Sequence, residues 1–222
     1  MLFVVATPIG NLGDITLRAL DVLKDVDLVA AEDTRHSGIL LKRYEVSKPL
    51  ISYHEHNEAM RTAQLVERLA AGQNIALITD AGTPGISDPG ARLIRECIKR
   101  GLDFTIIPGP SSILTALVGS GFSADKFFFG GFLPIKSGQR ERELRAAAQR
   151  GETSIFFESP YRLTKTLKAS IDILQDRQVC VARELTKKFE EFRRGAAAEL
   201  LAHYEKHPPK GEIVLLVSRL ED

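Results

Sequence analysis

The sequence has little cysteine, almost no net charge and no long apolar run. Its only cysteines, Cys97 and Cys180, form no CxxC pair and are flanked by apolar residues, so we predict two buried free thiols and a reducing cytoplasm. A formal net charge of +1 excludes a strongly basic, arginine-rich nucleic-acid binder, but it allows a local basic patch. The N-terminus lacks the charged region of a signal peptide, and no apolar stretch approaches the ~20 residues of a membrane helix. We therefore expect a cytoplasmic protein that does not contact a membrane.

Short strand-like runs alternate with amphipathic helical patterns over roughly the first 110 residues. Such alternation is typical of parallel strands in an open α/β sheet. Strands are predicted within 2–6, 27–33, 49–54, 75–80 and 103–108. Helices are predicted within 16–26, 37–46, 57–71 and 89–101, with Ser37 as a possible N-cap of the second.

The second half of the chain has a different pattern, and the segment PGPSS offers a stiff turn before it. Because 222 residues can build two cores, we predict an N-terminal α/β domain, residues 1–112, and a C-terminal α/β domain, residues 113–222. Helices are expected within 111–122, 138–150 and 162–174, and strands within 127–134, 153–159, 178–186 and 212–220. No Ser/Gly-rich linker separates the halves, which predicts closely packed domains.

Three loops stand out because each follows a predicted strand, and open α/β sheets bind ligands beyond the carboxyl ends of their strands. The loop ITDAGTPGISDPG (78–90) contains three glycines and two prolines, which favours a ligand loop over a plain connection. ATPIGNLGDIT (6–16) is either a ligand loop or an ordinary strand-to-helix turn. AAEDTRHSG (30–38) is either a polar site or a solvated turn with an Asp–Arg pair. None of the three is a Walker A loop, a GxGxxG fingerprint or a GxSxG elbow.

Other constellations are weaker. His54 and His56 lie close together, but a metal would need a third protein ligand, so we expect no metal site. Basic residues gather within 136–150, and again within 187–194 where Phe189 and Phe192 accompany them. Each set is either a solvated charged surface or a contact for RNA phosphates and bases.

Taken in order, the motifs resemble the tetrapyrrole methylase superfamily. The matching stretches are TPIGNLGDIT, AAEDTRHSG, TDAGTPGISDPG, PGPSS, GGFLP, FFESPYR and ARELTKKFE, followed by GEIVLLV. Within the superfamily they are similar to the branch that methylates the ribose 2'-hydroxyl of a cytidine in 16S ribosomal RNA. Each stretch alone is modest evidence, but the ordered set is specific.

The resemblance implies an open, mostly parallel N-terminal sheet, a C-terminal domain with a mixed sheet, and S-adenosylmethionine in the cleft between the domains. It further implies a homodimer that acts on 16S RNA within the 30S subunit. Backbone groups are expected to make most of the cofactor contacts. By position, these contacts fall on Pro8, Ala81, Gly82, Thr83, Ile86, Ser111, Ser112, Glu158 and Leu185.

Methylation of a ribose hydroxyl requires in-line positioning, and a general base or a nearby cation assists it. The candidates are Asp33, Arg35, Glu184 and Lys187, which follow predicted strands. Each of them could instead belong to a structural ion pair.

Two other functions stay open for the same sequence. One is C-methylation of a tetrapyrrole on the same fold, and the other is a non-catalytic ribosome-assembly factor. Ribosomal RNA members of the superfamily often carry an additional C-terminal helical segment, whereas this chain ends at Asp222, straight after the last predicted strand. We expect either a short member or a shortened chain.

Overall fold

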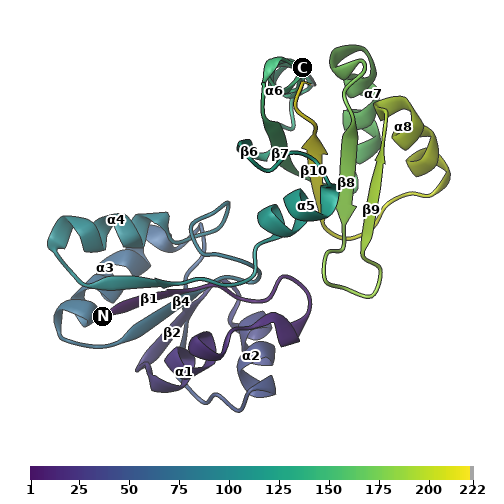
Figure 1. Ribbon diagram of the computed structural model, residues 1–222. Helices are drawn as coiled ribbons and strands as arrows, with labels where there is room; N and C mark the ends of the chain where they lie inside the picture. The colour runs from purple at the N-terminus through teal and green to yellow at the C-terminus, as the bar shows by residue number, and fades with distance from the viewer. Residues whose placement is uncertain (221–222) are drawn as a thin grey trace. The chain divides into compact units, whose positions relative to one another are not determined.

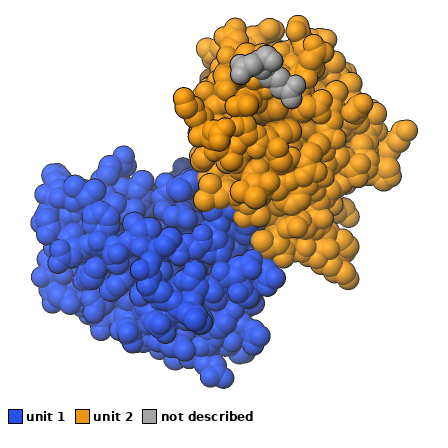
Figure 2. All heavy atoms as spheres, viewed as in Figure 1, with its two compact units in different colours: residues 1–111 blue, residues 112–222 orange. Residues whose placement is uncertain are grey.

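The computed structural model describes residues 1–220, and the chain divides into two compact units. Unit 1 comprises Met1–Ser111 and unit 2 begins at Ser112 (Figure 2). Among the described residues, no helix is both long and apolar enough to cross a membrane.

Unit 1 is an open sheet of five parallel strands, in the order β3-β2-β4-β1-β5 (Figure 1). This confirms the parallel α/β sheet predicted from the alternating pattern. Its strands are β1 (Leu2–Val5), β2 (Leu28–Ala31), β3 (Leu50–Ser52), β4 (Ile75–Ile78) and β5 (Phe104–Ile107). Its helices are η1 (Leu12–Asp14), α1 (Leu17–Asp25), α2 (Thr34–Arg43), α3 (Glu58–Ala70) and α4 (Ala91–Arg100).

The central strands of unit 1 are covered on both faces. Every residue of β2 and of β4 is buried, as expected for parallel strands between two helical layers. One apolar cluster joins the sheet to α1 and α2, and a second joins it to α3 and α4. The carboxyl ends of the strands are therefore left as the edge where loops and polar side chains gather.

Helix α2 begins three residues earlier than predicted. Asp33 is its N-cap, and its carboxylate accepts a hydrogen bond from the Arg35 amide at 2.8 Å. The prediction that Ser37 caps this helix was wrong, because Ser37 is buried inside it. Asp33 is a stronger helix start since its side chain reaches the free amides of the first turn.

Unit 2 contains a five-stranded mixed sheet in the order β6-β7-β10-β8-β9, as the resemblance implied. Strands β6 and β7 are parallel, and the remaining neighbours are antiparallel. The strands are β6 (Phe127–Phe132), β7 (Thr153–Glu158), β8 (Val179–Arg183), β9 (Glu191–Gly195) and β10 (Ile213–Val217). The helices are α5 (Ser112–Ser120), α6 (Ser137–Gln149), α7 (Leu163–Leu174) and α8 (Ala197–Lys206).

Alternate residues along the strands of unit 2 face different helices. Val179 and Val181 pack into the core formed with α6, α7 and α8. On edge strand β9, Arg194 instead donates to the backbone oxygens of Gly119 and Ser120 at the end of α5. Helix α5 therefore covers one face of the sheet and the other three helices cover the opposite face. Both cysteines are buried and free, as predicted, with Cys97 in unit 1 and Cys180 in unit 2.

Strand β9 and helix α8 were not predicted from the sequence. The β9 sequence, EFRRG, is mostly charged, so it carries no strand-like apolar alternation. It is nevertheless an edge strand, where ion pairs with neighbouring side chains satisfy its charges. The strand expected within 178–186 ends earlier, at Arg183, because Glu184 and Thr186 adopt positive φ angles of 50° and 65°.

Candidate functional site

The loops after β1 and β4 are hydrogen-bonded to each other at the carboxyl edge of the unit 1 sheet. Thr7 and Gly82 exchange a pair of backbone hydrogen bonds, of 2.9 and 3.1 Å. The Thr7 hydroxyl also donates to the Thr79 carbonyl at 3.0 Å. Because β1 and β4 are neighbouring strands, these bonds fix the two predicted ligand loops against each other. Pro8 and Ala81, each next to a bridged residue, are thereby brought together.

The glycine-rich loop after β4 depends on glycine for its shape. Gly82 has a φ of +81° and Gly90 a φ of +141°, conformations that side chains disfavour. A Cβ atom on Gly90 would also lie 3.0 Å from Leu77 Cδ2 and 3.1 Å from the Gly85 amide nitrogen. The Ile86 side chain is 44% exposed. The loop therefore offers a backbone surface with an accessible apolar side chain beside it, which suits a small ligand with both polar and apolar groups.

Carboxylates from β2 and β4 meet at the same edge. The Asp33 amide donates to Asp80 Oδ1 at 3.2 Å, and the Asp80 amide donates to Glu32 Oε2 at 3.4 Å. Burial raises the pKa of Glu32 above its ordinary value, and the Asp80 and Asp33 carboxylates act in the same direction. A carboxyl group with a raised pKa is a better proton acceptor than an ordinary one. The sequence prediction did not select Glu32, because its contact with Asp80 depends on the pairing of β2 with β4, which the sequence does not show.

Asp33 and Arg35 form a pair with each other. The Arg35 guanidinium donates to the two Asp33 carboxylate oxygens at 3.1 and 2.7 Å. These hydrogen bonds hold the pKa of Asp33 well below its usual range and raise the pKa of Arg35. The Arg35 side chain is nevertheless 90% exposed. Asp33 is thus a poor proton acceptor, whereas Arg35 is an oriented cation open to a ligand.

Glu158, at the carboxyl end of β7, is a buried carboxylate with all its bonds inside unit 2. It is 2% exposed. It accepts hydrogen bonds from the Thr166 hydroxyl at 2.6 Å and the Ser159 amide at 2.7 Å, and it pairs with Arg162 at 2.8 Å. The Glu158 side chain therefore anchors the turn into α7. A cofactor contact at this position would come from its backbone.

Glu184 and Lys187 also pair with each other. Lys187 Nζ lies 2.9 Å from Glu184 Oε1 and 2.9 Å from Glu212 Oε2. Burial raises the pKa of Glu184, but hydrogen bonds from Lys187 and the Glu212 amide outweigh burial and lower this pKa below its ordinary value. Leu185, next to Glu184 in the chain, is buried. The structure thus brings both candidates together in one ion-pair network that holds the turn after β8.

The other predicted positions lie in plain structural settings. Thr83 accepts a backbone hydrogen bond from the Ile86 amide at 3.3 Å, within the glycine-rich loop. Ser111 is the last residue of unit 1, and Ser112 begins α5. In the basic stretch, Arg140 is 7% exposed and donates to the Ile135 carbonyl at 3.1 Å, so it is not available to RNA. The His54 and His56 rings meet edge to face, and no group of potential metal ligands occurs among residues 1–220.

Comparisons with known proteins agree with this architecture. The family profile of Tetrapyrrole (Corrin/Porphyrin) Methylases matches residues 1–201. The chain is 48% identical to "Ribosomal RNA small subunit methyltransferase I" of Synechocystis sp., over 98% of this chain and 78% of that relative. It is 46% identical to the protein of the same name from Thermotoga maritima, over 99% of both chains.

A solved structure with low sequence identity shares the fold. The uroporphyrin-III-C-methyltransferase of Thermus thermophilus is 20% identical and superimposes with a TM-score of 0.68, covering 98% of this chain and 93% of that one. At this identity the likeness shows the fold alone. Profile and relatives together establish that the chain is a methyltransferase, belonging to the tetrapyrrole methylase family and, within it, to the ribosomal RNA small subunit methyltransferase I group.

Proposed function

We propose that this protein transfers a methyl group from S-adenosylmethionine to the ribose 2'-hydroxyl of a cytidine in 16S ribosomal RNA. The observation that carries the proposal is the 46% identity to a ribosomal RNA methyltransferase over 99% of both chains. The family resemblance extends it to a cytoplasmic homodimer that acts on RNA within the 30S subunit.

The loop residues of unit 1 fit the cofactor. S-adenosylmethionine supplies a methyl group already activated on a sulfonium, so the protein's task is largely to hold and orient it. We assign its contacts in unit 1 to Pro8, Ala81, Gly82, Thr83 and Ile86. The positive φ angle of Gly82 and its bridge to Thr7 support this assignment, because they shape a backbone surface that side chains do not cover. Ser111, Ser112, Glu158 and Leu185 stay predictions from the resemblance.

We assign proton acceptance and RNA binding to different side chains beside that loop. We assign proton acceptance to Glu32, because burial raises its pKa and Asp80 borders it. Arg35 is assigned to the RNA phosphate near the target, with Asp33 as the positioning residue that orients it. Glu184 and Lys187 stay candidates for a role in catalysis. They lie next to each other, but each is already engaged in an ion pair with the other.

The residue roles can be tested by the pH dependence of methylation. Glu32→Gln should lower kcat strongly and remove the acidic limb of the pH–rate profile. Asp33→Asn preserves a helix cap and should retain that limb while raising KM for RNA. A full acidic limb in Glu32→Gln would dismiss Glu32 as the proton acceptor.

The reaction itself is tested by incorporation of label from S-adenosylmethionine into small ribosomal subunits that lack their native modifications. Nuclease digestion and mass spectrometry should identify 2'-O-methylcytidine. Label on a base, or no label despite measurable binding of S-adenosylmethionine by calorimetry, would contradict the proposal.

A second candidate, C-methylation of a tetrapyrrole, is favoured by the fold shared with the Thermus thermophilus enzyme. It predicts that porphyrinoids stimulate turnover of S-adenosylmethionine. We expect porphyrinoids not to stimulate this turnover, because the relatives that match the chain at 44–50% identity are named as ribosomal RNA methyltransferases.

A further inference from the structure

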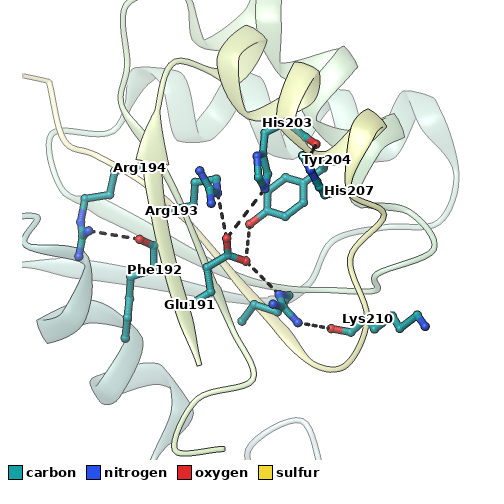
Figure 3. Close-up of polar contacts among 9 residues, drawn as sticks. Glu191, Phe192, Arg193, Arg194, His203, Tyr204, His207 and Lys210 are labelled. Carbon is teal, nitrogen blue, oxygen red and sulfur yellow. Dashed lines mark hydrogen bonds and ion pairs between the residues drawn. The ribbon is translucent and has the colours of Figure 1, made fainter. Parts of the chain in front are cut away.

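Unit 2 contains a pocket of about 440 Å³, and of its lining residues only Glu184 has been considered above as a candidate for the reaction. It lies where β8 ends, β9 begins and the chain leaves α8, because Arg183 and Glu191 are partners in the antiparallel pairing of the two strands. Figure 3 shows Glu191 and Arg193 of β9 converging with His203 and Tyr204 of α8. The lining residues are Arg183, Glu184, Phe189, Glu191, Arg193, His203, Tyr204, His207, Pro208, Pro209 and Lys210.

Glu191 organises the pocket (Figure 3). Its carboxylate accepts hydrogen bonds from Arg183 Nε at 3.0 Å, Arg193 Nε at 2.9 Å and the Tyr204 hydroxyl at 3.3 Å. Burial raises the pKa of Glu191, but the hydrogen bonds from Arg183 and Arg193 outweigh burial and lower this pKa below its ordinary value. One ionised carboxylate therefore orients two guanidinium groups.

The two guanidinium groups differ in what they have left to donate. Arg183 Nη1 donates to the Lys210 carbonyl at 3.2 Å, which ties down the rim of the pocket. Within residues 1–220, the terminal nitrogens of Arg193 have no protein acceptor, and the side chain is partly exposed. Arg193 thus presents an oriented pair of N–H donors, the arrangement that binds phosphate oxygens best.

The charge of the pocket favours an anion. Three cations, Arg183, Arg193 and Lys210, line it with two carboxylates. One of these carboxylates, Glu184, is already paired with Lys187. Burial, together with Arg193 and His207, lowers the pKa of His203, although Glu191 acts in the opposite direction, so we do not count its ring among the cations of the pocket. The attraction at neutral pH therefore comes from Arg193 and Lys210.

An exposed ring stands at the rim of the same pocket. Phe189 is 64% exposed, and Lys188 Nζ lies 5.6 Å from its ring centroid. Inorganic phosphate alone would gain little from a phenyl ring. A ring beside phosphate-binding cations is instead what single-stranded RNA uses, because an unpaired base stacks on it while the backbone is neutralised.

We infer that this pocket binds one phosphodiester of the substrate RNA through Arg193 and Lys210, while an adjoining unpaired base stacks on Phe189. The inference rests on the proposed function and adds an RNA contact from β9, α8 and the segment after it. The volume is sufficient for a nucleotide-sized group.

The test compares RNA binding by Arg193→Gln, Lys210→Gln and Phe189→Ala with the matched control Lys168→Gln, an exposed lysine of α7. The probes are small ribosomal subunits lacking native modifications and a single-stranded oligoribonucleotide, titrated at several salt concentrations. Lys210→Gln is informative even if Arg193→Gln disturbs Glu191, because only the backbone of Lys210 holds another residue.

Each of the two cation variants should weaken RNA binding about three- to tenfold and reduce the salt slope by about 1. Phe189→Ala should weaken binding comparably with an unchanged slope. Calorimetry should show unchanged affinity for S-adenosylmethionine in all three, and Lys168→Gln should match the wild type.

The inference would be overturned if the three variants bound RNA like the control. It would also be overturned if the pocket bound inorganic phosphate and the variants that abolished this binding kept their affinity for RNA. The proposed function fails differently, since it predicts label in 2'-O-methylcytidine. Normal methylation with no effect of the pocket variants would refute only the RNA contact. RNA binding through the pocket without any methylation would refute the function.

Discussion

Two sheet edges differ in what shapes them. At the carboxyl edge of the unit 1 sheet it is mainly the backbone of two loops, and at the edge of the unit 2 sheet where β7 and β8 end and β9 begins it is side chains. In unit 1 the part of the edge formed by the loops after β1 and β4 is shaped by backbone: Gly82 and Thr7 bridge the two loops, and glycines occupy positive φ angles. In unit 2 the edge is shaped by charged side chains, with Glu158 and Glu191 each holding several partners. A backbone surface suits a small ligand held closely, whereas an array of oriented cations suits a charged polymer. The comparison fits our proposal that the glycine-rich loops of unit 1 hold the cofactor and that the charged pocket of unit 2 contacts the RNA.

The largest effect should come from removing a buried charge in unit 2. Glu158→Ala leaves Arg162 and Thr166 without their partner, and we expect it to lower the free energy of unfolding by about 3 kcal/mol. Urea denaturation measures this loss. The control is Glu96→Ala, which breaks an exposed pair with Arg100 and should cost less than about 1 kcal/mol. Equal losses in the two variants would show that the unit 2 edge does not depend on its buried side chains.

The next effect should fall on unit 1 and on cofactor affinity. Gly82→Ala places a side chain at φ +81°, which costs about 1–2 kcal/mol and strains the bridge to Thr7. We expect affinity for S-adenosylmethionine to fall about tenfold, measured by calorimetry. Gly72→Ala is the matched control, because Gly72 has a φ of +89° and open space around it, just after α3. It should lose similar stability and keep its affinity; a parallel loss of affinity would mean that strain alone explains the result.

The smallest effect concerns the pH dependence of stability at the unit 1 edge. Because burial raises the folded-state pKa of Glu32 above its ordinary value of 4.5, its stabilising contribution is complete below that pH and is lost as the pH rises through the folded-state pKa. Glu32→Gln should therefore lose less stability than the wild type between about pH 4.5 and 7. Urea denaturation across that range measures the difference, with exposed Glu67→Gln as the control. Identical pH profiles for Glu32→Gln and the wild type would contradict a raised pKa at the partly buried Glu32.

The unit 1 sheet was predictable because its apolar strands and amphipathic helices alternate along the chain. The loops after β1 and β4 were predictable too, since their glycines and prolines follow strands directly. The contact between Glu32 and Asp80 was not, because it joins residues 48 apart and depends on the order β2-β4-β1. The same holds for the pocket around Glu191. Its side chains come from a charged edge strand and from α8, and only the pairing of β9 with β8 brings them together.

The most direct test of a division between the two edges is a steady-state kinetic measurement with both substrates varied, on small ribosomal subunits lacking native modifications. The account predicts that Gly82→Ala raises KM for S-adenosylmethionine about tenfold and leaves KM for RNA near the wild-type value. Arg193→Gln should do the reverse, raising KM for RNA alone. If both variants raised the same KM, or if neither changed either one, the assignment of the cofactor to the loops after β1 and β4 and of an RNA contact to the unit 2 pocket would be contradicted.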